Sequence, residues 1–217
     1  KEVTELKEKF ARNAQRTFLA APVRITSDFT TPFLPNEVFD APEKIELRAA
    51  INELKPLALA IANTTEKAVE YRVVVERMPV EGELRFDWHD GRPFPGITLR
   101  QGIAMRDAAT SGNALLDPLP KLNEASTILV PAKEAGLLWV DFDTSLMEAG
   151  NYEGRIRIIP LNGKGGFTQA GYGYGNLNYD GEMLDLPFLL KVDNFELSKE
   201  PSLPGNYFSP PYNQEVV

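Results

Sequence analysis

The stretch that decides the fold runs from residue 45 to residue 75 and reads IELRAAINELKPLALAIANTTEKAVEYRVVV. Apolar side chains recur at every second position in the runs 45–51, 57–61 and 69–75, and charged side chains fill many of the positions between them. A period of two is typical of a strand with one face in a core and the other in water. Asn63-Thr64-Thr65 indicates a turn after the second run. The stretch therefore predicts three successive β-strands.

The same period continues along the chain, with turn signals at Asp90-Gly91, 111–113 and 149–151. The further alternating runs are Leu84, Phe86 and Trp88, then Ile156 and Ile158 between Arg155 and Arg157, and finally Leu184, Leu186, Phe188, Leu190 and Val192. About nine short strands without interleaved helices favour a sandwich over an α/β sheet. We predict an all-β, antiparallel two-sheet sandwich of Ig-like or jelly-roll-like type, with the charged positions facing water.

The N-terminal end has a different period. Four apolar residues follow one another at steps of three or four, namely Val3, Leu6, Phe10 and Ala14. This spacing predicts a short helix within residues 1–20, docked on the sandwich, and a linker from a missing anchor is the alternative. Residues 21–197 then form the sandwich domain, and the proline-containing residues 198–217 form a C-terminal tail or linker.

Composition excludes several classes of function. The 217 residues include 23 Lys and Arg against 31 Asp and Glu, a formal net charge of −8 that repels phosphate backbones, so we expect no nucleic-acid partner. There is no cysteine for a disulfide, a thiolate zinc site or a nucleophile. No apolar run approaches the ~18 residues of a membrane span. Phosphate-binding and dinucleotide fingerprints are missing too, and we expect no cofactor.

Two sets of residues are candidates for chemistry. His89, the single histidine, lies between Asp87 and Asp90. A metal or acid–base site is the functional interpretation, but Asp90-Gly91 favours a hairpin, so we expect no metal there. Asp141 and Asp143 share one face of a predicted strand at a spacing that suits paired glycosidase carboxylates. We interpret them as part of a solvated face.

A glycine- and aromatic-rich segment, residues 162–182 (NGKGGFTQAGYGYGNLNYDGE), lies between two predicted strands and should form an extended hairpin loop. Four of its aromatic residues could stack on sugar rings and form a ligand-binding platform: Phe167, Tyr172, Tyr174 and Tyr179. Packing against the sandwich or a neighbouring domain is the alternative, because exposed aromatic rings usually cover something; a loop that is simply flexible is the third.

Trp139 and Tyr152 are predicted to be structural. Trp139 lies in the most apolar strand, where a sandwich commonly places a core tryptophan. Tyr152 stands between Gly150 and Gly154, and its hydroxyl could bond the backbone at a strand corner.

Several of these segments resemble a known family in sequence. They are residues 135–142 (AGLLWVDF), 149–154 (AGNYEG), 186–197 (LPFLLKVDNFEL), 116–120 (LDPLP) and 50–53 (AINE). In their order along the chain they resemble elements of the N-terminal β-sandwich of glycoside hydrolase family 123 and of related bacterial glycosidase-like proteins of unknown function.

The resemblance implies a role without catalysis. In that family the catalytic acids lie in a barrel after the sandwich, and a barrel needs ~200–250 residues. No catalytic residue is therefore carried over. We expect a non-catalytic accessory module of an exported bacterial protein, periplasmic or on the cell surface, whose partner is a carbohydrate or a neighbouring protein domain. A small glycosidase that uses Asp141 and Asp143 is the alternative.

Overall fold

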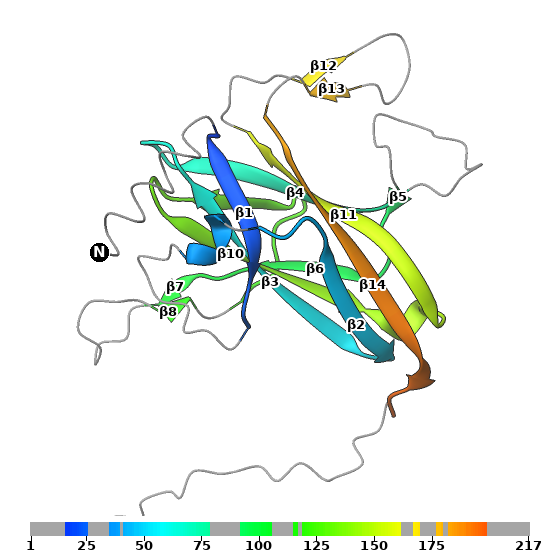
Figure 1. Cartoon of the computed structure of the whole chain (residues 1–217). Coiled ribbons are helices and arrows are strands. Elements are labelled where there is room, and N and C mark those ends of the chain that lie inside the picture. The colour runs from blue at the N-terminus through cyan, green and yellow to red at the C-terminus, as the bar shows by residue number, and fades with distance from the viewer. Residues whose placement is uncertain are drawn as a thin grey trace, which may run out of the picture.

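The alternating runs of the sequence become the strands of two stacked sheets (Figure 1). The computed structural model describes residues 16–25, 35–39, 41–78, 92–105, 115–116, 119–161, 167–169, 177–179 and 182–198. The four-stranded sheet has the order β1 (Phe18–Val23), β3 (Leu54–Asn63), β10 (Ala135–Asp143) and β6 (Ile97–Gln101).

The six-stranded sheet has the order β2 (Ile45–Ile51), β14 (Leu184–Glu196), β11 (Gly150–Pro160) and β4 (Val69–Arg77). Two short strands, β5 (Arg92–Pro93) and β9 (Thr127–Val130), pair with different ends of the same β4 edge. The remaining short strands form two small ribbons, β7 (Ala104–Met105) with β8 (Leu115–Leu116), and β12 (Phe167–Gln169) with β13 (Leu177–Tyr179).

The predicted all-β, Ig-like sandwich is confirmed, with one difference in strand direction. Among the described strands every neighbouring pair is antiparallel except β2 and β14, which run parallel with Phe188 opposite Ile45. These two strands are separated by most of the chain, so no tight turn constrains their relative direction.

The helical content is small in the part of the chain that the structure describes. It consists of two 3-10 turns, η1 (Asn36–Phe39) and η2 (Thr144–Leu146), and no described helix is long and apolar enough to cross a membrane. Most of the predicted N-terminal helix, residues 1–15, lies outside the described residues, as do the predicted strand at 84–88 and the tail from 199 to 217. Residues 18–20, which the helix prediction included, are the start of β1.

The main core fills the space between the sheets. β3 contributes Leu57, Leu59 and Ile61, and the other strands contribute aromatic rings that meet at tilted or edge-to-face angles. The centre of this group is Phe94, whose ring centroid lies 5.1 Å from that of Phe188 and 5.8 Å from that of Phe142. Such pairs add stability beyond the area they bury.

A second core covers the outer face of the four-stranded sheet. β3 presents Ala58, Ala60 and Ala62 there, all fully buried. Because alanine side chains are short, Val38 of η1 and Leu116 of β8 can lie close to the sheet, and both belong to this second core. The four-stranded sheet is therefore apolar on both faces.

Candidate functional site

The predicted aromatic platform is described only in part. Phe167 and Tyr179 are directly opposite each other in the register of β12 and β13, so the predicted hairpin contains a two-stranded ribbon. Figure 1 shows that ribbon beyond the ends of β11 and β14. Tyr172 and Tyr174 lie outside the described residues. The platform therefore stays a prediction.

Asp141 does not belong to a solvated face, which corrects the interpretation made from the sequence. It is 5% exposed and lies on the outer face of the four-stranded sheet. Its Oδ1 accepts a hydrogen bond from Trp139 Nε1 at 2.8 Å, and its Oδ2 accepts one from Arg100 Nε at 2.8 Å. Arg100 Nη1 also donates to the carbonyl of Leu119 at 3.2 Å. The carboxylate thus holds a neighbouring strand and the 119–121 segment in place.

Asp143 has a separate local role. It is exposed, as predicted, and its Oδ1 accepts a hydrogen bond from Ser145 N at 2.9 Å at the start of η2. Hydrogen bonds from the side chain and backbone of Ser145 lower the pKa of Asp143 below its usual value. A general acid for glycoside hydrolysis needs the opposite shift. The two aspartates are therefore tied to different structural partners.

Trp139 and Tyr152 are both structural, but Trp139 lies on the other side of its sheet from the predicted position. It packs against the second core rather than between the sheets, because the inward positions of β10 are Leu138, Val140 and Phe142. The prediction for Tyr152 is confirmed: its hydroxyl donates to the carbonyl of Glu148 at 2.9 Å, across the corner that leads into β11.

The segment resembling the family at residues 50–53 ties three parts of the chain together. Asn52 has φ = +64°, a left-handed conformation that asparagine tolerates better than most residues. Its Nδ2 donates to the carbonyl of Leu197 at 3.3 Å, after β14. Glu53 accepts from Ala50 N at 2.8 Å, and its own N–H donates to Thr144 Oγ1 at 2.9 Å. These residues fix the end of the sandwich.

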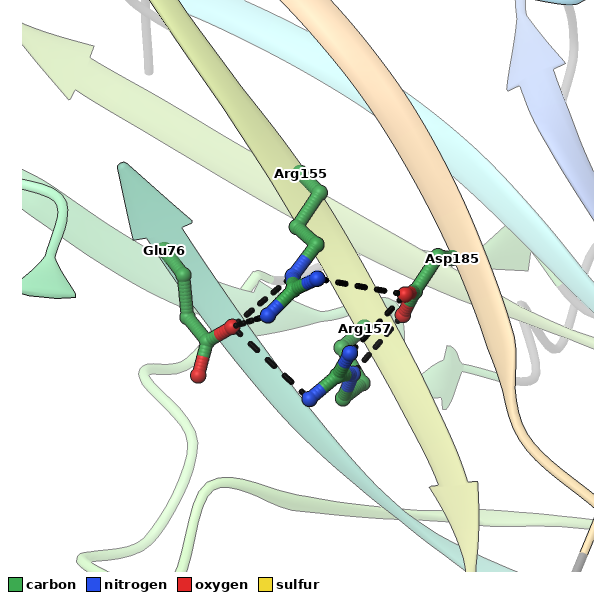
Figure 2. A network of polar contacts seen from close by, with 4 residues as sticks. All are labelled: Glu76, Arg155, Arg157 and Asp185. Carbon is green, nitrogen blue, oxygen red and sulfur yellow. Dashed lines mark hydrogen bonds and ion pairs between the residues drawn. The ribbon is translucent and has the colours of Figure 1, made fainter. Parts of the chain in front are cut away.

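Four charged side chains form a closed network on the outer face of the six-stranded sheet (Figure 2). Arg155 Nε and Nη2 donate to Glu76 Oε2 at 2.9 and 2.8 Å. Arg157 Nε and Nη2 donate to the two carboxylate oxygens of Asp185 at 2.8 and 2.9 Å. Longer contacts of 3.6 Å (Arg155 to Asp185) and 3.9 Å (Arg157 to Glu76) close the network.

The alternating pattern predicted that Glu76, Arg155 and Arg157 face water, and the structure corrects this for Glu76 and Arg155. Glu76 is 1% and Arg155 8% exposed. Burial is tolerated because each charge lies directly opposite a partner of opposite sign: Glu76 is opposite Arg155, and Asp185 is opposite Arg157. The two positive and two negative charges cancel, so the network binds β4, β11 and β14 to one another.

A cleft of about 640 Å³ lies at an open side of the sandwich. Its walls are Val73–Val75 of β4 and Ile97–Leu99 of β6, which belong to different sheets. The segment 121–126 closes one end, because Leu122 N donates to the carbonyl of Leu99 at 2.9 Å and Val73 N donates to that of Ser126 at 2.9 Å. Sequence reasoning missed this cleft.

Metal-binding chemistry has no candidate in the described part of the chain. No group of three or more His, Cys, Asp or Glu side chains is placed there to hold an ion. His89 and its neighbours lie outside the described residues, so the predicted hairpin at Asp90-Gly91 is not tested.

Comparison with known proteins gives likeness at the level of the fold. The sequence matches no protein family and no curated protein. Among solved structures, a family 123 glycoside hydrolase from Clostridium perfringens has 9% identity and a TM-score of 0.49, over 82% of this chain and 27% of that chain. The class 5 fimbriae chaperone CfaA has 6% identity and a TM-score of 0.39, over 70% of this chain and 55% of that chain.

A PapD-like domain of human CEP192 has 10% identity and a TM-score of 0.36, over 82% of this chain and 100% of that domain. The chain thus spans about a quarter of the hydrolase and about half of the fimbrial chaperone. These likenesses are distant and concern the sandwich fold only.

Proposed function

We propose that this chain is a non-catalytic β-sandwich module that serves a bacterial glycan-degrading system by binding. The observation that carries the proposal is that the carboxylates of Asp141 and Asp143 accept hydrogen bonds from structural partners. Both oxygens of Asp141 hold Trp139 and Arg100, and Asp143 holds Ser145. The sequence resemblance to family 123 supports the link to glycan degradation. Within the segments that carry the resemblance, Asn52, Glu53 and Tyr152 make structural hydrogen bonds.

The test of non-catalysis is a screen of the isolated chain on aryl-glycosides, including N-acetylgalactosaminides. We expect no turnover above the uncatalysed rate. The Asp143→Asn variant is the decisive comparison, since Asp143 is exposed and its replacement leaves the buried contacts of Asp141 intact. Turnover by the natural chain that disappears in Asp143→Asn would favour the small glycosidase instead.

The binding surface of this module is the hairpin of residues 162–182. Its support is the aromatic content of the segment and the register that sets Phe167 opposite Tyr179. Stacking of single rings on sugars is shallow, so we expect oligosaccharide affinities in the range of about micromolar to millimolar.

Titration with oligosaccharides tests this surface through Tyr172→Ala and Tyr174→Ala. Phe195→Ala is a matched control, because Phe195 is an exposed aromatic residue at the far end of β14. We expect the tyrosine variants to lose binding and the control to keep it. Equal binding by all three variants would remove the hairpin from the proposal.

A further inference from the structure

Among the residues that the structure describes, the cleft between β4 and β6 has backbone groups without hydrogen-bond partners on both walls. In a β-strand, both the N–H and the C=O of one residue point to one side of the strand, and those of the next residue point to the other side. In β4 the even-numbered residues bond β11, as the bonds of Glu70 and Met78 show, so Val73 and Val75 direct their backbone groups to the open edge. Between β9 and β5 no strand pairs with this edge in the described residues.

Each wall offers one carbonyl and one N–H that bracket a single residue. On β4 they are the carbonyl of Val73 and the N–H of Val75, on either side of Val74. The N–H of Val73 already donates to the carbonyl of Ser126, and the carbonyl of Val75 already accepts from the N–H of Phe94. On β6 they are the carbonyl of Ile97 and the N–H of Leu99, on either side of Thr98. None of the four has a hydrogen-bond partner in the part of the chain that the structure describes.

The unpaired groups of β4 are costly where they lie. Val73 is 1% and Val75 7% exposed, and a buried backbone group without a partner costs free energy comparable to a lost hydrogen bond. The β6 wall is half-buried and more accessible. Next to it, Lys121 already bridges Arg100 in an antiparallel arrangement, so one short piece of chain uses this edge in the same way.

The side chains around the cleft select the kind of segment that fits. Val73, Ile97 and Leu99 make its walls apolar. Its ionisable lining consists of Arg72, Lys121 and Glu124, a formal charge of +1 in a chain of −8. Apolar walls with a positive rim suit an extended chain in which apolar and acidic residues alternate.

From this geometry we infer that the cleft is a strand-addition site, which takes an extended acidic peptide segment of a partner protein onto the edge of β6 at Thr98. Main-chain hydrogen bonds supply affinity in this mode, and the pockets for alternate side chains supply specificity. The inference is independent of the proposed function, because it uses a different surface and a different class of ligand.

The experiment uses the ¹⁵N-labelled full chain and the peptide acetyl-(Val-Glu)₃-amide as the probe. We expect the amide of Leu99 to show a chemical-shift change and at least tenfold slower hydrogen exchange at saturation. Acetyl-(Val-Lys)₃-amide should bind several-fold more weakly. An N-methylated (Val-Glu)₃ peptide keeps the side chains but lacks the backbone N–H groups that pair with a neighbouring strand, so it should not bind.

The variant Lys121→Glu reverses the charge at the rim and should reverse the preference between the two peptides. Lys67→Glu is the matched control, because Lys67 is an exposed lysine outside the cleft. Unchanged exchange at Leu99, or equal binding of the N-methylated peptide, would overturn the inference. Protection of Leu99 that depends on protein concentration without peptide would assign the edge to a second copy of the chain and would overturn it as well.

Discussion

At the scale of single residues, Gly154 is a position where two strands and a ring leave no room for a side chain. A Cβ at this position would lie 2.3 Å from Phe188 Cζ and 2.7 Å from the carbonyl oxygen of Glu76. Phe188 is held among other rings in the main core, so it cannot move aside cheaply.

We therefore expect Gly154→Ala to lower the free energy of unfolding by about 2 kcal/mol or more, from overpacking. Urea denaturation measures this. Gly150→Ala, four residues earlier in the same strand, is the control, because its Cβ would meet only Tyr152 Cε2 at 3.9 Å. Similar losses in the two variants would mean that Phe188 does not constrain the strand.

Tyr71 carries a buried hydroxyl that has no hydrogen-bond partner among the described residues. Burial, and then the charge of Glu182, raises the pKa of Tyr71, so the hydroxyl stays protonated. We expect Tyr71→Phe to raise the free energy of unfolding by about 1 kcal/mol, because it removes an unsatisfied polar group.

Tyr152→Phe makes the same chemical change with the opposite expectation. The Tyr152 hydroxyl bonds the carbonyl of Glu148 at 2.9 Å, so its removal should cost about 1 kcal/mol. Parallel urea titrations of the two variants compare them. A loss of stability in Tyr71→Phe would show that its hydroxyl has a partner, such as water.

Asp193 gives the protein a predictable response to acid. A hydrogen bond from Arg48 holds the pKa of Asp193 below its usual value, and Arg48 and Lys191 add attraction between charges. Because the folded state lowers this pKa, the stabilising contribution is fully present above the unfolded-state pKa of about 3.9 and is lost as the pH falls through the folded value.

The variant Asp193→Asn should therefore be less stable than the natural chain at pH 7, and the difference should shrink steadily below about pH 4. Urea denaturation at several pH values between 7 and 3 measures the difference. Arg48→Gln removes the other partner and should give the same pH profile. A difference that does not change with pH would show that Asp193 acts through packing rather than charge.

At the scale of elements, the charge network of β4, β11 and β14 shows how burial changes the contribution of an ion pair to stability. Removing one charge leaves these four side chains with a net charge that is partly buried. We expect Glu76→Gln to lower the free energy of unfolding by about 3 kcal/mol or more, because Arg155 is itself 8% exposed. The double variant Glu76→Leu/Arg155→Met removes both charges and should recover much of the loss.

An exposed ion pair between Lys44, which directly precedes β2, and Glu153 of β11 provides the control. Lys44 Nζ lies 2.7 Å from Glu153 Oε1, but the side chains are 40% and 61% exposed. Lys44→Met should therefore change stability by less than about 1 kcal/mol. Thermal and urea unfolding of all three variants compare the pairs. Equal losses at the two pairs would mean that burial of the network does not determine its contribution.

The strands themselves could be predicted from the sequence because burial on one face leaves a period of two. The second core left a signal as well: the positions between Leu57, Leu59 and Ile61 are all alanine, which indicates a strand that is apolar on both faces. Trp139 and Asp141 of the neighbouring strand β10 lie on the same outer face of the sheet, and the second core covers that face.

Other features depend on relations between strands, which one sequence does not contain. The burial of Glu76 follows from its register with Arg155, 79 residues later. The cleft depends on the gap that β5 and β9 leave along β4, and on the edge of β6 in the other sheet. Turn signals and alternation predict the elements but not their order in a sheet.

At the scale of the whole molecule, the two cores share the strands of the four-stranded sheet. β3 and β10 send alternate side chains into the main core and the second core, so neither core can lose its packing without disturbing the same two strands. Regions that share strands in this way usually unfold as one cooperative unit.

Trp139 reports on the second core, since it packs there and donates to Asp141 at 2.8 Å. In a Trp88→Phe background it is the single tryptophan, because the chain contains two. We expect its fluorescence and the far-UV circular dichroism of the sheets to change at the same urea concentration, with equal slopes. A fluorescence transition at lower urea would show that the cover of the second core detaches first, and that the four-stranded sheet survives with its outer face open to solvent.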